Sequence, residues 1–170
     1  MLKVIMPLLC SLVLSVALAE VKRKGHVHQH GKGSFSIAIQ GTQGKLELKS
    51  PIDSIVGFEH KPKKPKDVAI YDKAMTKLSS EISKMVIFDP TLNCEIKKDL
   101  FETSQESSGN HSDIVVDYNV ICGKSPEGTT MNLDFSKTFP RLKEVEISIL
   151  VGVLQKSAAY TGSPLAVELK

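Results

Sequence analysis

The chain has no tryptophan and few aromatic residues of any kind, which make up 5% of its 170 residues. Its formal net charge is +3, and its basic clusters do not alternate with aromatic side chains. Nucleic-acid-binding surfaces usually combine basic residues with aromatic stacking platforms. Nucleic acid is therefore not an expected partner.

Enzyme signatures are also missing. The chain contains no Gly-x-Ser-x-Gly elbow, no glycine-rich phosphate loop and no His-Glu-x-x-His helix. We therefore expect that the protein is not an enzyme. A metal-dependent hydrolase is a weaker alternative, because zinc with an open coordination position activates water.

The one long hydrophobic run lies at the N-terminus. Lys3 precedes an almost wholly apolar stretch at residues 4–18, and Ala17-Leu18-Ala19 has the small-x-small pattern of a cleavage site. The run is shorter than the roughly 20 residues that a transmembrane helix needs. We predict a cleavable signal peptide at residues 1–19 and a soluble product without a membrane anchor. Residues 20–170 fit a single β-rich domain, in which residues 20–27 can be flexible.

Cysteine is scarce. The chain has three, and Cys10 is removed with the predicted signal peptide. In an exported chain, the remaining Cys94 and Cys122 are most simply paired in a disulfide, which would stabilise the fold by roughly 3–4 kcal/mol. The alternative is a pair of thiolate ligands for a metal ion, which an oxidising compartment disfavours.

Hydrophobic periodicity predicts an α+β fold. Between residues 65 and 85, apolar side chains recur every three or four positions, as an amphipathic helix requires, and Asp67 can cap its start. Strands are expected at residues 34–39, 46–48, 85–88, 92–97, 114–121, 130–134, 145–151 and 165–169. The expected architecture is a mostly antiparallel β-sheet or sandwich with one substantial helix and one disulfide.

Three of the five histidines follow the predicted signal peptide, in His26-Val27-His28-Gln29-His30. On an extended chain, alternate side chains project from the same face about 6.8 Å apart. This spacing lets neighbouring imidazoles bind one zinc ion through Zn–N bonds of about 2.0–2.1 Å. The alternative is a polar chain end that is frayed.

The other two histidines, His60 and His111, lie at expected strand ends or loop boundaries. His111 is followed by Ser112-Asp113, so His111 and Asp113 share a face where that stretch is extended. Zinc binds imidazole nitrogen and carboxylate oxygen, usually with four ligands. Positions of this kind can converge at one end of a sheet and form a dispersed ligand set.

A series of short segments carries a resemblance. His28-Gln29-His30-Gly31 is followed by an alternating strand to Gly41, by Leu46-Glu47-Leu48-Lys49-Ser50-Pro51, and by Ile55-Val56-Gly57-Phe58-Glu59-His60. The predicted helix, Phe88, Cys94, His111-Ser112-Asp113, Cys122 and Phe139-Pro140 then follow, ahead of an apolar run to Val153. In these segments, over nearly the whole expected mature chain, the protein resembles the ZrgA family of zinc-regulated periplasmic proteins.

The resemblance implies a bacterial periplasmic zinc-binding accessory protein or metallochaperone that assists high-affinity zinc uptake. The implied partners are Zn²⁺ and an ABC-type uptake system. The metal ligands that it supports are His28, His30, His60 and His111, with Glu59 and Asp113 as ligands or supporting residues. His26 falls outside the matched motif and is an additional candidate.

One departure from the family pattern limits the inferred role. Members often carry a long histidine-rich insertion before the His-x-Asp pair, whereas residues 102–110 here contain no histidine. This difference argues against high-capacity zinc buffering and leaves a defined site. The alternative function is a β-rich envelope protein that binds another protein without metal.

Overall fold

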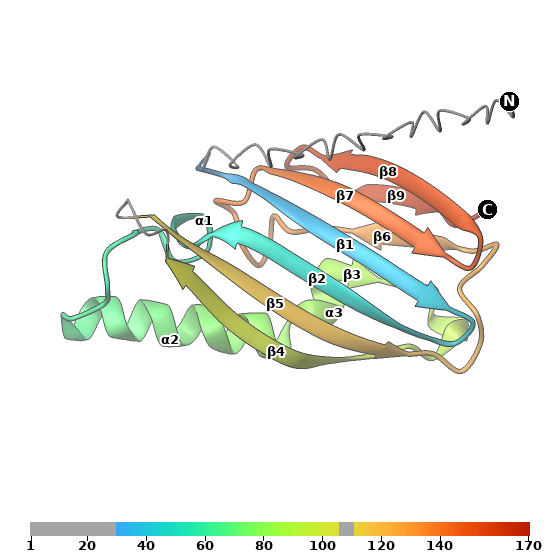
Figure 1. Cartoon of the computed structure of the whole chain (residues 1–170), viewed down its shortest axis with the longest axis horizontal. Helices are drawn as coiled ribbons and strands as arrows, with labels where there is room; N and C mark the ends of the chain where they lie inside the picture. The colour runs from blue at the N-terminus through green and yellow to red at the C-terminus, as the bar shows by residue number, and fades with distance from the viewer. Residues whose placement is uncertain (1–29, 106–110) are drawn as a thin grey trace, which may run out of the picture.

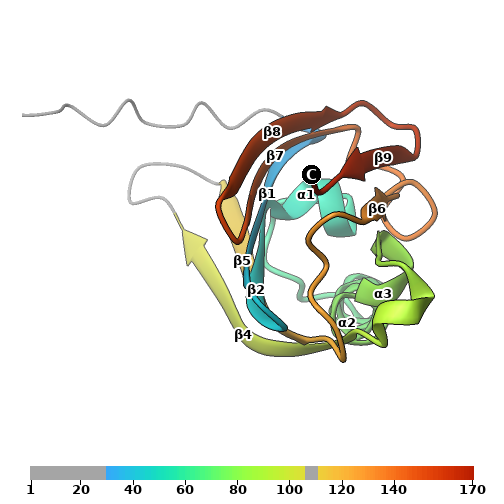
Figure 2. The same cartoon turned by 90° about the vertical axis from the view of Figure 1, so that its right-hand side faces the viewer.

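Two β-sheets and a long helix enclose the core in the computed structural model, which describes residues 30–105 and 111–170. The larger sheet has the strand order β4-β5-β2-β1-β7-β8, and the smaller sheet has the order β3-β6-β9. Figure 2 shows the large sheet curving around α1, with α2, α3 and the small sheet on its concave side. Neighbouring strands are antiparallel except β1 and β7, which run parallel. The predicted fold class is confirmed.

The elements follow one another along the chain as Figure 1 labels them. The strands of the large sheet are β1 (Lys32–Gln40), β2 (Gln43–Pro51), β4 (Glu95–Gln105), β5 (Ser112–Ile121), β7 (Glu144–Val151) and β8 (Leu154–Tyr160). The small sheet contains β3 (Val86–Ile87), β6 (Thr130–Leu133) and β9 (Leu165–Glu168). The helices are α1 (Ile52–Val56), α2 (Pro65–Ser80), α3 (Ile82–Met85) and the 3₁₀ turn η1 (Pro90–Leu92).

The large sheet buries one face because its strands alternate apolar and polar residues. On β1, Phe35, Ile37 and Ile39 are buried, as the alternation predicts. On β5 the buried side chains are Ile114, Val116, Tyr118 and Val120. The Tyr118 hydroxyl donates to the Leu78 carbonyl of α2 at 2.9 Å. This hydrogen bond holds the helix against the sheet.

The predicted helix at residues 65–85 is two helices, because the backbone of Glu81 leaves the helical region at φ −113° and ψ 12°. Asp67 does not cap α2, which corrects the prediction. The helix begins with Lys64 at the N-cap and Pro65 at its first position, where a missing N–H costs no hydrogen bond. Asp67 lies inside the first turn, where an acidic side chain is still favourable.

Several boundaries differ from the expected ones. The strand expected at 92–97 begins at Glu95, because residues 90–92 form η1, which Asp89 caps through its side chain. The strand then continues to Gln105, well beyond its expected end at residue 97. Both α1 and β8 were not predicted. A five-residue helix is too short to show a helical period, and β8 contains the small residues Ser157, Ala158 and Ala159.

Cys94 and Cys122 form the predicted disulfide, so they are not thiolate metal ligands. The bond joins the start of β4 to the end of β5, next to the paired residues Glu95 and Ile121. The described part of the chain holds no helix with the length and apolar character that a bilayer crossing requires. The predicted signal peptide at residues 1–19 lies outside the described residues.

Candidate metal centre

A short helix after β2 carries a residue that sequence reasoning did not identify. Chain direction changes at Pro51, and α1 places Asp53 in its first turn. Gly57 then ends α1 in the left-handed conformation at φ 91°, and its N–H donates to the Asp53 carbonyl at 2.7 Å. A Cβ on Gly57 would also lie 2.9 Å from the Arg141 Nε, so a side chain here would be strained and crowded. This turn directs Glu59 back toward α1.

The start of β1 is tied to the same helix. The Gly31 N–H donates to the Ser54 hydroxyl at 2.9 Å, and Ser54 is buried. On its other side, the Gly31 carbonyl accepts hydrogen bonds from the backbone N–H groups of Lys143 and Glu144. These contacts fix the backbone next to His30 and place its imidazole beside α1.

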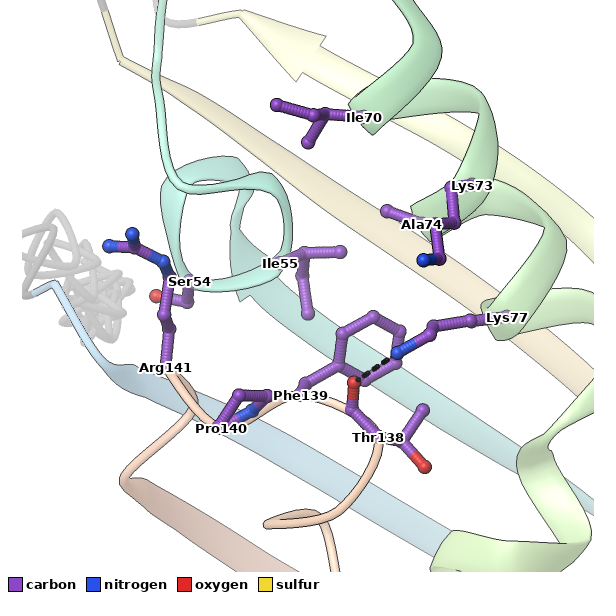
Figure 3. Close-up of a pocket in the computed structure, with 10 residues that line it drawn as sticks. All are labelled: Ser54, Ile55, Ile70, Lys73, Ala74, Lys77, Thr138, Phe139, Pro140 and Arg141. Carbon is purple, nitrogen blue, oxygen red and sulfur yellow. Dashed lines mark hydrogen bonds between the residues drawn. The ribbon is translucent and has the colours of Figure 1, made fainter. Parts of the chain in front are cut away.

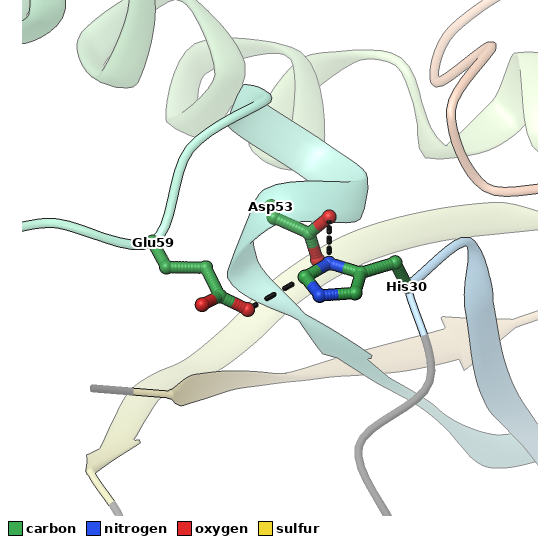
Figure 4. Close-up of side chains that lie close together, drawn as sticks. All are labelled: His30, Asp53 and Glu59. Atoms are coloured by element: carbon green, nitrogen blue, oxygen red, sulfur yellow. Dashed lines mark hydrogen bonds and ion pairs between the residues drawn. The ribbon is translucent and has the colours of Figure 1, made fainter. Parts of the chain in front are cut away.

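His30, Asp53 and Glu59 form one cluster. Each offers a ligand atom within 4.8 Å of the other two. His30 Nδ1 donates to Asp53 Oδ2 at 2.5 Å and lies 3.7 Å from Glu59 Oε1. Figure 4 shows both carboxylates approaching the same imidazole, one from α1 and one from the loop that follows it. The His30 side chain is 63% exposed, while those of Asp53 and Glu59 are 17% and 23% exposed.

The charge of Asp53 acts on His30. Its hydrogen bond and its negative charge raise the pKa of the His30 imidazole above the ordinary value of 6.5, and the charge of Glu59 adds a smaller effect. Desolvation acts in the opposite direction and does not cancel the rise. The metal-free cluster therefore favours a protonated imidazole beside two carboxylates.

His111 lies next to this cluster. Its Nδ1 lies 2.8 Å from Glu59 Oε1, and its ring centroid lies 6.3 Å from that of His30. His111 comes 52 residues after Glu59 in the chain, and the fold brings its imidazole to the Glu59 carboxylate. A histidine hydrogen-bonded to a carboxylate is a common arrangement around metal ligands, and it holds the carboxylate in place.

His60 and Asp113 make other contacts. His60 lines the same hollow as the cluster, which has a volume of about 630 Å³. Its Nε2 lies 3.1 Å from Asp67 Oδ2, and its ring stacks on Phe58 with the centroids 4.7 Å apart. Asp113 is buried at the start of β5, with its Oδ2 3.6 Å from Lys49 Nζ. Their assignment as ligands stays a prediction, and His26 and His28 lie outside the described residues.

Asp53 is the cluster member that the sequence did not point to. The local signal around it is an acidic residue two positions after a proline, which is typical of a helix start. Nothing in that signal indicates a metal ligand. His30 and Asp53 are 23 residues apart, so their proximity depends on the pairing of β1 with β2.

The donor set suits zinc. One imidazole nitrogen and two carboxylate oxygens are ligands that Zn²⁺ accepts at about 2.0–2.2 Å. Small side-chain rotations would close spacings of up to 4.8 Å around one ion. Two carboxylates would also balance the charge of a divalent cation, and the imidazole favours zinc over the hard ions calcium and magnesium.

Comparison with known proteins identifies the family. The model of the family described as "ZrgA family zinc uptake protein" matches residues 27–169. The chain belongs to the ZrgA family. A role in zinc uptake follows from this membership, and the resemblance seen in the sequence is confirmed. The matched span includes the whole cluster, whereas His26 precedes it. No curated protein matches the chain.

Proposed function

We propose that this ZrgA-family chain is a periplasmic zinc-binding accessory protein that receives one zinc ion and delivers it to an ABC-type uptake system. The observation that carries the proposal is the meeting of His30, Asp53 and Glu59 within 4.8 Å of one another in a chain of a zinc uptake family. Binding and transfer need no catalysis, so the protein acts as a carrier and not as an enzyme.

The exposure of the cluster supports transfer more than storage. Structural zinc sites usually have four protein ligands and are closed to solvent. Here the imidazole is largely exposed, and both carboxylates are accessible to a lesser degree. An acceptor's ligand can therefore approach a bound ion and replace one protein ligand at a time.

Neighbouring side chains form hydrogen bonds to the two carboxylates of the cluster. Ser54 donates to Asp53 Oδ1 at 3.4 Å, and His111 contacts Glu59 at 2.8 Å. Hydrogen bonds of this kind orient carboxylates before a metal ion arrives, and their loss typically costs 10–100-fold in affinity. His111 is proposed to hold Glu59 in the free protein and to complete the zinc ligands when the ion is bound.

Calorimetric titration of metal-stripped protein with zinc tests the proposal. We expect one zinc ion per chain, with at least tenfold weaker binding in His30→Ala, Asp53→Asn and Glu59→Gln, equivalent to about 1.4 kcal/mol each. Asp72→Asn is a matched control, because Asp72 is an exposed carboxylate on α2 outside the cluster. His28→Ala and His60→Ala, measured in parallel, test whether the predicted N-terminal histidine and the Asp67-bound histidine add to the site.

Two outcomes would contradict the proposal. Absence of zinc binding at micromolar concentrations would remove the carrier role, and unchanged affinity in the three cluster variants would move the site elsewhere. A protein partner that binds equally well with and without zinc would favour the alternative, a metal-independent interaction protein of the cell envelope.

A further inference from the structure

A second hollow lies on the other side of α1 from the zinc cluster. Ser54 and Ile55 of α1, part of α2 and residues 138–141 line it, and its volume is about 250 Å³. Positions 53 and 55 are separated by about 200° around a helix, so Asp53 and Ile55 face opposite sides. Figure 3 shows Ile55, Ala74 and Phe139 around this groove, between α2 and the 138–141 segment.

The floor and wall of the groove are apolar. Ile55, Ala74 and Phe139 are buried and form its floor. Ile70 stands at the wall with 37% of its surface exposed, although it is a large aliphatic side chain. Removing the rest of this apolar surface from water is favourable, so Ile70 gives an occupant of the groove an apolar side chain to pack against.

The rim of the groove is positively charged. Lys73, Lys77 and Arg141 line it, and within residues 30–105 and 111–170 no carboxylate forms an ion pair with any of the three. Lys77 Nζ donates to the Thr138 carbonyl at 3.2 Å, which joins the two walls and leaves further N–H donors on the ammonium (Figure 3). The rim therefore favours an occupant with negative charge.

The acidic side chains nearest the groove do not face its cationic rim. Asp53 contacts His30 on the opposite side of α1, and Asp67 contacts His60. Asp72 lies about 200° around α2 from Ile70, so it faces away from the groove. The cations of the rim are thus not neutralised by nearby side chains in the described chain.

We propose that this groove docks an acidic segment of a partner protein, in which aspartate or glutamate flanks one or two aliphatic side chains. The aliphatic side chains would pack on Ile70 and the apolar floor, and the carboxylates would pair with Lys73, Lys77 and Arg141. The groove is smaller than the 300–1,000 Å³ of typical small-molecule sites and is open, which suits a side chain of a peptide. A flat lipid surface would meet the rim but not the concave floor.

The groove shares a wall with the zinc cluster. Arg141 lines the groove, and its guanidinium group packs against Gly57, which lines the hollow that holds His30 and Glu59. A segment bound at Arg141 therefore lies one residue away from that hollow. The assignment of the partner as the zinc acceptor rests on the proposed function, whereas the docking itself does not.

Peptide binding tests the docking surface. The probe is a short fluorescein-labelled peptide with two leucines flanked by aspartate and glutamate, and the control peptide has lysine at every acidic position. We expect the acidic peptide to bind, measured by fluorescence anisotropy, and to shift the backbone amide signals of α1, α2 and residues 138–141. Ile70→Asp and Lys73→Glu should each weaken binding about tenfold or more.

Lys124→Glu is the matched control, because it makes the same charge change on an exposed lysine near the end of β5, at the opposite end of the sheet. Circular dichroism at increasing temperature verifies that Ile70→Asp is folded, as the exposure of Ile70 leads us to expect. Equal binding of both peptides, amide shifts outside the groove, or equal losses in Lys124→Glu would overturn the proposal. Binding of phosphatidylglycerol vesicles without binding of the acidic peptide would also overturn it in favour of a membrane.

The experiments distinguish failure of the docking proposal from failure of the zinc-binding proposal. His30→Ala should lose zinc and keep the peptide, whereas Ile70→Asp should lose the peptide and keep zinc. Peptide binding in a protein that binds no zinc would leave the docking surface in place and remove its link to zinc delivery. Zinc binding without peptide binding would remove the docking surface alone.

Discussion

The two hollows on either side of α1 are built on one helix of five residues but have opposite chemistry. On one side, the carboxylates of Asp53 and Glu59 lie beside an exposed imidazole. On the other, Ile55 belongs to an apolar groove with a cationic rim. The volumes also differ, at about 630 and 250 Å³.

A helix of five residues is enough to separate two surfaces of opposite charge. Positions 53 and 55 of α1 point to opposite sides, so Asp53 belongs to the cluster and Ile55 to the groove. Ser54 lies between them, because its hydroxyl donates to Asp53 and the residue also lines the groove. The separation depends on where α1 ends, because Gly57 and Arg141 form the boundary between the two hollows. Changes at this boundary should affect both sides together.

The largest effect on both hollows is expected from Gly57→Ala. A side chain at φ 91° costs about 1–2 kcal/mol, and its Cβ would displace Arg141 from the shared wall. We expect lower thermal stability, weaker zinc binding because Glu59 moves, and weaker peptide binding because Arg141 moves. Urea unfolding and the two titrations measure these changes.

Gly128→Ala is the control for that substitution. Gly128 has a similar φ of 80°, but nothing lies within 4 Å of the position of a Cβ. It should lose stability through backbone strain alone and keep both binding activities. If Gly57→Ala behaves in the same way as Gly128→Ala, the boundary between the hollows does not couple them.

An intermediate effect, confined to the cluster, is expected from pH. Asp53 raises the pKa of His30 above 6.5, and zinc binds the neutral imidazole. As pH is lowered, zinc affinity should therefore begin to fall while the pH is still above 6.5. Below the raised pKa, the affinity should fall about tenfold per pH unit for each proton that zinc displaces. Peptide binding at the groove should not follow this curve.

The stability of the metal-free protein depends on pH in the opposite direction to zinc affinity. Because the folded-state pKa of His30 is raised, its pairing with Asp53 stabilises the metal-free fold fully below pH 6.5, and this contribution is lost as pH rises through the raised pKa. In Asp53→Asn the pKa of His30, followed by NMR of its imidazole, should move back toward 6.5. An unchanged pKa in that variant would show that Asp53 is not its cause.

The smallest effect on either hollow is expected from removal of the disulfide. Cys94→Ala with Cys122→Ala should lower the free energy of unfolding by roughly 3–4 kcal/mol, measured in urea. Zinc and peptide affinities should remain within about twofold of the parent protein at temperatures where the variant is folded, since the bond lies at the far end of β5 from Asp113 and Pro51. A tenfold loss of either affinity would show that the two ends of the sheet are coupled.

Strong periodicity made most of the fold predictable. The alternation around Phe35 and Tyr118 indicated the buried face of β1 and β5, and the three- and four-residue spacing indicated α2. Elements without a clear period were missed: α1 is too short, and β8 carries small residues. The break between α2 and α3 at Glu81 was also missed. The hydrophobic spacing of α2 continues into α3, so the pattern does not reveal that the backbone leaves the helical conformation at this residue.

The site was predictable in part. Histidines are rare in this chain and indicated metal chemistry, and His30, Glu59 and His111 do lie together. Asp53 could not be predicted, because the importance of a common residue type depends on its neighbours in space. Asp113 is held beside Lys49, a contact that follows from the pairing of β2 with β5.

The family, the disulfide and the division of the strands into buried and exposed faces followed from the sequence alone, because they depend on local patterns and on the number of cysteines. Which side chains meet depends on the three-dimensional fold. The start of β1, the helix α1, the loop after it and the start of β5 come together at one end of the sheet through backbone pairing over long sequence distances. That pairing, together with the turn at Gly57, brought an aspartate and a glutamate to His30 on one side of α1, where they form the candidate metal centre, and left an apolar groove on the other side.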